Sequence, residues 1–191
     1  QLSAGLFILP FFLFSGISGQ ICDKYEKSGL MNKIKILEVM IMLVGATAFI
    51  MRSKYLLLLS LFFMGAQSTL FGPVKYSILP QHLKGKDLLK GNAYTSMGTF
   101  LFILFGTILG GTLLSKNVIF DNNYYAISIS IILFAVLGLL ASAFIPKADA
   151  ADSKREISFN IPIQTYRTMK LITQNQKTRS EEHTSELQSP D

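Results

Sequence analysis

Three polar side chains lie inside long apolar stretches, where they could take part in binding or transport. Lys75 and Gln67 lie in the apolar stretch that begins at Tyr55, and Glu38 lies near the start of another. At 1.5 Å per residue in a helix, Lys75 is about 30 Å from Tyr55, at the end of a membrane-length segment, and Gln67 is near its middle. A charged or polar group inside a membrane is costly unless it is paired, hydrated or able to reach the surface.

Each of these residues has a functional and a purely structural interpretation. Lys75 either binds a phosphate as a point charge or only extends to the membrane interface. Gln67 either lines a cavity, which we favour, or forms a hydrogen bond between helices. Asn92 either caps the next helix, which we favour, or faces the same mouth of the protein as Lys75. Glu38 lies one turn inside its span, within reach of Lys35 or of a cation in the adjoining loop.

The remaining chemistry-bearing residues do not indicate an enzyme. His82 and Asp87 have the H-x-x-x-x-D spacing of glycerolipid acyltransferases, but we interpret two residues in a lysine-rich segment as a coincidence. The sequence contains no nucleophile elbow, P-loop or dinucleotide fingerprint. Cys22 is the only cysteine and nothing has metal-ligand spacing. The sequence therefore predicts no catalytic residue, no metal site and no cofactor.

The composition excludes an ordinary soluble domain. Charged residues make up 16% of the 191 residues, against about 25% in a typical soluble domain. The apolar residues form blocks of roughly 17–25 residues, the length that an α-helix needs to cross a bilayer. Most cations lie between these blocks, as in the loops of membrane proteins, so the net charge of +6 does not indicate nucleic-acid binding.

The blocks predict an all-α, polytopic membrane protein. The expected spans cover residues 1–22, 34–51, 55–78, 93–114 and 125–145, and residues 147–178 form a basic linker. The turn at residues 52–54 is so short that the second and third spans must be antiparallel neighbours. Small-xxx-small pairs, Ser15 with Gly19 and Gly106 with Gly110, predict close helix packing.

The distribution of Lys and Arg predicts the orientation. Residues 23–33, residues 79–90 and the segment 146–178 each carry at least three Lys or Arg, whereas the two other connections carry two and one. By the positive-inside rule, the three lysine-rich segments face the cytoplasm, and residue 1 lies on the outer side. Five spans with an outside N-terminus lead us to expect one further span before Gln1.

The C-terminal end of the chain is polar and unlike the sequence before it. RSEEHTSELQS, at residues 179–189, resembles the translation of a sequencing adapter. We therefore treat residues 179–191 as a non-native tail and leave them out of the fold prediction. The alternative is an ordinary disordered tail.

With the additional span, the chain would have the six helices and the following linker of one half of a major facilitator superfamily transporter. The segment Gly19-Gln-Ile-Cys-Asp23-Lys24 and the lysines after it resemble the signature of that family, roughly Gly-x-x-x-Asp-Arg/Lys, in the loop after its second helix. The resemblance implies helices 2–6 of the N-terminal half. It also implies that Asp23 and Lys24 form a cytoplasmic gate, with Gly19 in close packing; the alternative is a solvated loop.

FGPVKYSILPQHL at residues 71–83, followed by Lys90-Gly-Asn92-Ala, resembles the lysophospholipid transporter branch, which includes fusions to an acyltransferase and an acyl-carrier-protein synthetase. The resemblance covers about residues 5–145. It implies a bacterial inner-membrane carrier that moves lysophosphatidylethanolamine and related lipids to the inner leaflet for re-acylation. The carrier would work by alternating access between two six-helix halves. Gln67, Lys75 and Asn92 are then the candidate substrate-binding residues.

The expected partners are lysophospholipid, membrane lipids, a missing C-terminal half and an acyltransferase or acyl-carrier-protein synthetase, but no nucleic acid. Two alternatives stay open: the membrane part of a fused 2-acylglycerophosphoethanolamine acyltransferase, and a facilitator for another small molecule. Many members of the superfamily carry an arginine in the fourth helix that is linked to proton coupling. Residues 55–78 contain no arginine, so proton coupling is not assumed.

Overall fold

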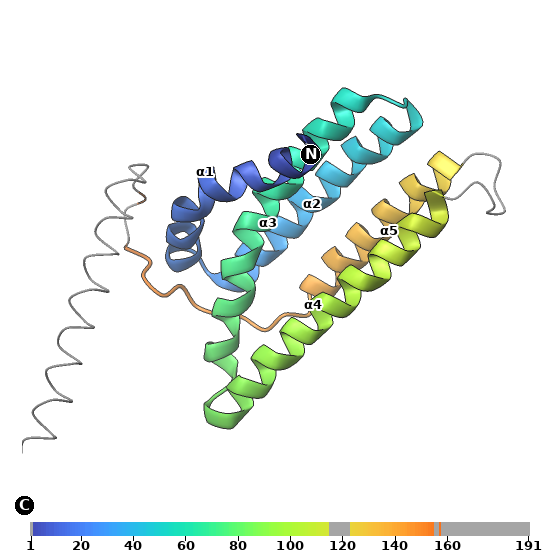
Figure 1. Ribbon diagram of the computed structural model, residues 1–191. Coiled ribbons are helices and arrows are strands. Elements are labelled where there is room, and N and C mark those ends of the chain that lie inside the picture. The colour runs from blue at the N-terminus through green and yellow to red at the C-terminus, as the bar shows by residue number, and fades with distance from the viewer. Residues whose placement is uncertain (1, 115–122, 155–156, 158–191) are drawn as a thin grey trace, which may run out of the picture. The chain divides into compact units, whose positions relative to one another are not determined.

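In the part that the computed structural model describes, residues 2–114, 123–154 and 157, the chain folds into α-helices followed by a non-helical segment after α5 (Figure 1). The helices are α1 (Leu2–Lys24), α2 (Lys27–Ile50), α3 (Lys54–His82), α4 (Gly85–Leu114) and α5 (Asn123–Ser142). No strand occurs in these residues, so the all-α prediction is confirmed. All of the helices except α2 are long and apolar enough to cross a membrane. Residues 179–191 and most of the expected linker lie outside the described part.

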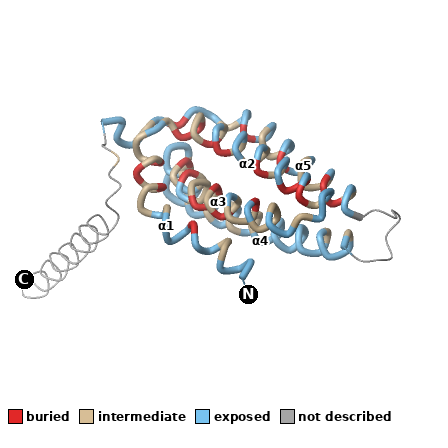
Figure 2. Tube along the Cα trace, turned by 90° about the horizontal axis from the view of Figure 1, so that it is seen from above, coloured by how far each residue is buried: buried red, intermediate tan, exposed pale blue. Residues whose placement is uncertain are grey.

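The helices do not pack in chain order. α3 packs along both α1 and α2, and α2 packs along α5, whereas α4 has only limited contact with α3 and α5. The buried positions therefore lie on α1, α2, α3 and α5, as the red segments in Figure 2 show. α4 has no buried residue. It is the most loosely attached helix of the unit.

The predicted antiparallel turn between α2 and α3 is a Schellman motif without glycine. Arg52 takes a left-handed backbone conformation with φ of 52°. Its N–H donates to the carbonyl of Phe49 at 3.1 Å, and the N–H of Ser53 donates to the carbonyl of Ala48 at 3.0 Å. This is the pair of hydrogen bonds that closes a helix C-terminus. The guanidinium of Arg52 also lies 4.6 Å from the ring centre of Tyr124 at the start of α5.

The helices begin earlier than the sequence predicts. Residues 27–33, expected in a loop, form the first turns of α2, and only Leu83 and Lys84 separate α3 from α4. Asn92 thus lies seven residues inside α4, so the interpretation of Asn92 as an N-cap is wrong. The reason is that the Lys and Leu residues of this segment are good helix formers, with Asp87 favourably placed in the first turn.

The close contact between α1 and α3 is made at Gly65. A Cβ atom at this position would lie 2.3 Å from the carbonyl oxygen of Phe7. Nearby, the hydroxyl of Ser18 donates to the carbonyl of Thr69 at 2.6 Å. In contrast, a Cβ at Gly19 would meet no described atom within 4 Å, so the predicted close packing at Gly19 is wrong. Only the tertiary fold decides which of several small residues lies against the backbone of a neighbouring helix.

This difference between two glycines gives a matched pair of variants. We expect Gly65→Ala to destabilise the chain by roughly 1–3 kcal/mol, because the added methyl group overlaps a backbone carbonyl that cannot rotate away. Gly19→Ala should be neutral or stabilising, since alanine is the better helix former by about 1 kcal/mol. Unfolding of both variants in mixed detergent micelles measures the difference. Equal stability of the two variants would contradict the close contact at Gly65.

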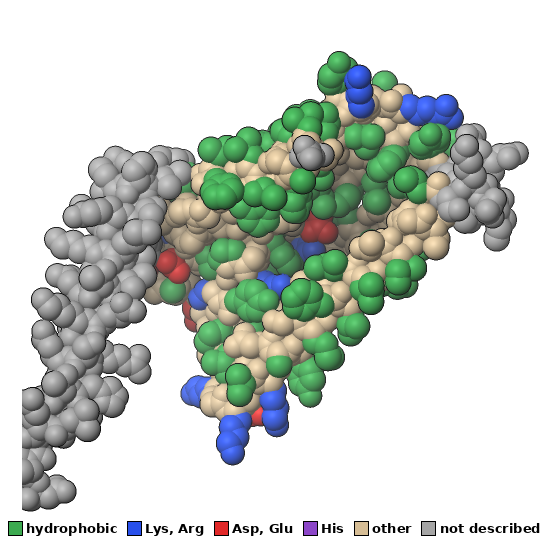
Figure 3. All heavy atoms as spheres, viewed as in Figure 1, with side chains coloured by type: hydrophobic (Ala, Val, Ile, Leu, Met, Phe, Trp, Pro, Cys, Tyr) green, Lys and Arg blue, Asp and Glu red, His purple; other side chains and the backbone are tan. Residues whose placement is uncertain are grey.

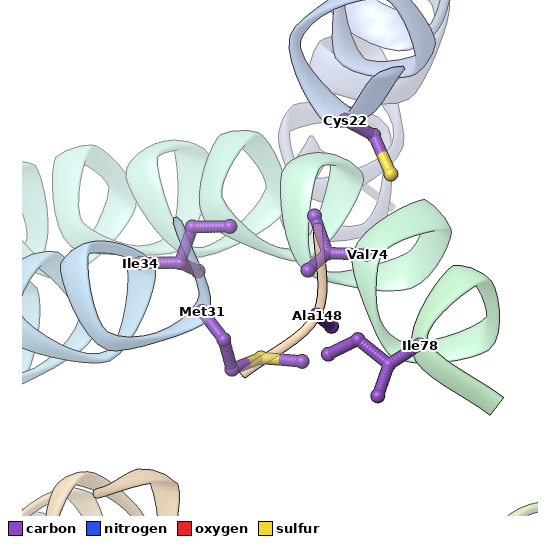
Figure 4. Close-up of a cluster of buried hydrophobic side chains, with 6 residues drawn as sticks. All are labelled: Cys22, Met31, Ile34, Val74, Ile78 and Ala148. Carbon is purple, nitrogen blue, oxygen red and sulfur yellow. The ribbon is translucent and has the colours of Figure 1, made fainter. Parts of the chain in front are cut away.

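The apolar core lies where the ends of α1, α2 and α3 meet the segment after α5. It contains Cys22, Met31, Ile34, Val74, Ile78 and Ala148. Figure 4 shows the side chains of Met31, Val74 and Ile78 around Ala148. The core thus joins four separate parts of the chain at the end that carries the Gly19–Lys24 motif.

Candidate functional site

Glu38 is the centre of a polar network between α2 and α3. Its carboxylate oxygen Oε2 lies 2.8 Å from Nζ of Lys35 and accepts a hydrogen bond from Nε2 of Gln67 at 2.9 Å. The side chains of Lys35 and Glu38 are 17% and 18% exposed. The ammonium of Lys35 also lies 4.5 Å from the ring centre of Phe71. Of the two partners that the sequence leaves open for Glu38, Lys35 and a loop cation, the structure has Lys35.

Glu38 also lies on the wall of a cavity of about 560 Å³ between α2, α4 and α5. The rest of the wall is almost wholly apolar and includes Phe105, Phe134 and Gly106. Figure 3 shows acidic and basic side chains inside the hollow beside these helices. Gln67 does not line this cavity; it is buried and makes the interhelical hydrogen bond to Glu38. The glycine pair of α4 opens onto the cavity and makes no close helix contact among the described atoms.

Lys75 has a different environment from Lys35. It is half-buried, and its Nζ donates to the hydroxyl of Thr99 on α4 at 3.0 Å. The same ammonium lies 4.7 Å from the ring centre of Tyr76, whose hydroxyl is 3.4 Å from that of Ser96. Within the described ranges, no carboxylate lies within 4.0 Å of Lys75. Lys75 is therefore a partly buried cation surrounded by hydroxyl groups and aromatic surface.

Asn92 lies on the same side of α4 as Thr99, the partner of Lys75, and Ser96, the partner of Tyr76. Ser96 and Thr99 follow Asn92 by four and seven residues, the spacings that place side chains on one helix face. Asn92 is half-buried. The structure thus brings Lys75 and the Asn92 face of α4 to one end of the bundle, whereas Gln67 lies two helical turns away along α3.

The residues of the predicted gate lie at the C-terminal end of α1. Lys24 is the last residue of the helix, and both Asp23 and Lys24 are half-buried. The carbonyl oxygen of Asp23 accepts a hydrogen bond from the backbone N–H of Asp152 at 2.9 Å. The motif is therefore joined to the segment that follows α5.

Glu26 is a structural residue that the sequence prediction missed. Its carboxylate caps α2 by accepting hydrogen bonds from the N–H and hydroxyl of Ser28 and from the N–H of Gly29 at 2.7 Å. It also accepts the N–H of Ala148 at 3.2 Å. These bonds, led by that of the Ser28 hydroxyl, lower the pKa of the Glu26 carboxyl from 4.5 to about 2, although burial opposes the shift. An acidic residue directly before a helix is the sequence pattern that could have predicted this cap.

This pKa gives a prediction for acid stability. Because the pKa of Glu26 is lower in the folded chain than its ordinary 4.5, the carboxylate stabilises the fold above pH 4.5, and this contribution is lost as the pH falls towards about 2. We therefore expect the stability difference between the wild type and Glu26→Gln to shrink over this pH range. Thermal unfolding followed by circular dichroism at a series of pH values measures it. A difference that does not change with pH would contradict the prediction.

A family model and similar known proteins both point to one family of membrane transporters. A family model described as Major Facilitator Superfamily matches residues 1–176. The chain is 28% identical over 148 residues to the lysophospholipid transporter LplT of Pectobacterium carotovorum, covering 76% of this chain and 33% of that protein. It is 26% identical over 159 residues to the LplT of Photorhabdus laumondii, covering 82% and 36%. For the LplT of Yersinia pestis, the identity is 25% over 150 residues, covering 77% and 33%.

The chain spans about a third of the length of the curated relatives that it matches. No solved structure matches it. The family match nevertheless covers most of the chain, and it agrees with the all-helical fold and the apolar helices described above. The chain thus belongs to the major facilitator superfamily and is a multi-pass protein of a bacterial inner membrane.

Proposed function

We propose that this chain is part of a lysophospholipid transporter that moves lysophosphatidylethanolamine-type lipids across the inner membrane by alternating access. The names of the relatives support this substrate class, with 25–28% identity over about three quarters of the chain. The motif of residues 71–83 supports it from the sequence. In this proposal the chain holds no catalytic residue, and re-acylation of the lipid is the work of another domain or protein.

The observation that carries the proposal is the environment of Lys75. A lysophospholipid carries an anionic phosphate, and a partly desolvated ammonium without a carboxylate partner is suited to bind it. The hydroxyl of Thr99 accepts from this ammonium and itself donates to the carbonyl of Thr95 at 2.7 Å, so it positions Lys75. The hydroxyl of Ser96, beside that of Tyr76, can donate to a phosphate oxygen. Lys35 cannot take this role in the same way, because Glu38 already neutralises it at 2.8 Å.

The position of Lys75 suits a late step of inward transport. By the residue count along α3 and by the lysine-rich segment that follows, this end of the bundle faces the cytoplasm. A head group bound there would be at the exit of the transport path. Asp23 and Lys24 lie at the end of α1 and α3 ends at His82, so the proposed gate and the proposed phosphate site share one side of the membrane.

Uptake of labelled lysophosphatidylethanolamine tests the proposal. The full-length gene is expressed in cells that lack their own carrier, and we expect uptake above that of cells with an empty vector. Competition by unlabelled lysophospholipid, but not by sugars or drugs, separates this substrate class from another facilitator function. Uptake at background level would overturn the proposal. Reading the gene beyond residue 178 shows whether the carrier is fused to soluble acyltransferase domains.

A further inference from the structure

The segment that follows α5 is held against the ends of three other helices. We call residues 145–152 the strap. Ala148 in its middle is only 1% exposed and belongs to the apolar core together with Met31 and Ile78. Ile145 packs against the same core. A connection that is buried in this way is part of the packed structure, since ordinary connecting segments run over the surface.

Two hydrogen bonds join the strap to the start of α2. The N–H of Lys27 donates to the carbonyl of Ala148 at 2.8 Å. In the opposite direction, the N–H of Ala148 donates to the carboxylate of Glu26 at 3.2 Å. Both backbone groups of Ala148 are therefore satisfied by neighbouring residues of the α1–α2 junction, which is 122 residues away along the chain.

Three more hydrogen bonds hold the next part of the strap. The carbonyl of Asp149 accepts both the ammonium of Lys27 at 3.1 Å and the side-chain amide of Gln81 on α3 at 2.8 Å. The N–H of Asp152 donates to the carbonyl of Asp23 at 2.9 Å. The ends of α1, α2 and α3 are thus connected through one short piece of backbone.

The buried charge of Lys27 makes this arrangement cooperative. Lys27 is only 3% exposed, and its ammonium donates to the strap carbonyl of Asp149 at 3.1 Å. If the strap left, this ammonium would lose that partner while still lying among buried groups, which is unfavourable. The apolar contact of Ala148 would be lost in the same step. The strap should therefore be released as a unit and not one bond at a time.

We propose that residues 145–152 form a latch that docks on the α1–α2 junction and the end of α3, with Glu26 as the residue that holds it closed. Glu26 has two separable tasks: it caps α2 and it binds the N–H of Ala148. Through the bond between Asp152 and Asp23, the latch also fixes the Asp23–Lys24 motif to the segment after α5. A movement of the latch must then be accompanied by a movement of the Asp23–Lys24 motif.

Amide hydrogen exchange of the 191-residue chain in detergent micelles tests the latch. Glu26→Asp keeps a residue that caps helices well, but its shorter side chain no longer reaches Ala148. We expect roughly tenfold faster exchange, the loss of about one hydrogen bond to a charged group, at the N–H of Ala148, Lys27 and Asp152 together. The N–H of Gly29 should keep its protection in Glu26→Asp and lose it in Glu26→Ala.

The amides of Lys27 and Asp152 decide the result, because Glu26 is not their acceptor. Faster exchange at Ala148 alone, or at none of the three, would overturn the latch. Asp152→Ala is the matched control: its side chain accepts only the N–H of Lys154 in the described region, so this variant should exchange like the wild type. Equal acceleration in Asp152→Ala would also overturn the proposal.

Cys22 reports whether the bundle itself stays folded. It is the only cysteine of the chain, is buried, and lies 3.0 Å from the hydroxyl of Ser77 in the contact between α1 and α3. Slow labelling of this thiol by a maleimide shows that α1 and α3 remain packed in a variant. If Glu26→Asp labels fast, Lys27→Met replaces it as the test variant, since it removes the bond to Asp149 and leaves the cap. The same three amides must then respond together, and their failure to do so overturns the latch.

Discussion

Replacing Lys75 with alanine in the full-length transporter should reduce lysophosphatidylethanolamine uptake roughly 10- to 100-fold, as expected for the loss of a hydrogen-bonded charge worth about 1.5–3 kcal/mol. The reason is that Lys75 is the partly buried lysine without a carboxylate partner in the described part of α3, held by Thr99 at 3.0 Å. Initial rates of uptake at several substrate concentrations measure the effect. Lys75→Arg keeps the positive charge and should retain more uptake than Lys75→Ala.

The control for this variant is a lysine on the same side of the bundle. The side chain of Lys90 is 68% exposed and lies 4.0 Å from Asp87. Lys90→Ala removes the same charge from the protein but leaves the proposed phosphate site intact, so uptake should stay near the wild-type rate. An equal loss in both variants would indicate a general effect of surface charge. Wild-type uptake in both Lys75→Ala and Gln67→Ala would remove α3 from the mechanism.

Replacing Glu38 with alanine should destabilise the folded chain by roughly 1–3 kcal/mol, the cost of leaving a partly buried hydrogen-bonding group without its partner. Lys35 would keep its charge near the membrane interior without its partner at 2.8 Å, and Gln67 would lose its acceptor. The free energy of unfolding in mixed detergent micelles measures this change. Glu38→Gln keeps a hydrogen-bond acceptor for Gln67, so its free energy of unfolding should fall less than that of Glu38→Ala.

The double variant Lys35→Met, Glu38→Leu separates the pair from the single charges. Because apolar side chains of similar volume remove the desolvation cost of both charges, its stability should be near that of the wild type or higher. The coupling energy then follows from a double-mutant cycle with Lys35→Met and Glu38→Leu alone. Additive effects of the two substitutions would show that the contact between Lys35 and Glu38 does not contribute to stability.

Local patterns predicted the parts of the structure that depend on neighbouring residues. The apolar blocks predicted the helices. The spacing of three residues put Lys35 within reach of Glu38 on one helix face, although it did not decide between Lys35 and a loop cation. The short segment at Arg52 predicted the antiparallel turn between α2 and α3. In each of these features, the interacting groups are fewer than six residues apart or belong to one helix.

Features that depend on distant residues could not be predicted in this way. The partners of Glu26 include Ala148, 122 residues away, and no local pattern connects the two. Gly19 and Gly65 both lie in apolar helices, yet only Gly65 meets a backbone, because the crossing of α1 and α3 places Phe7 there. The start of α4 was misplaced since charged residues extend the helix beyond its apolar part, where hydropathy gives no signal.

The order of packing has a consequence for biogenesis. Helices inserted one after another into a membrane first exist separately and then associate. α1, α2 and α3 can associate as soon as the third of them has left the ribosome, because α3 packs along both α1 and α2. α4 has no buried residue, so we expect it to remain largely exposed to lipid until α5 has been inserted and packs against α2. A nascent chain that stops after residue 114 would therefore hold α1, α2 and α3 packed together, with α4 only loosely attached to α3.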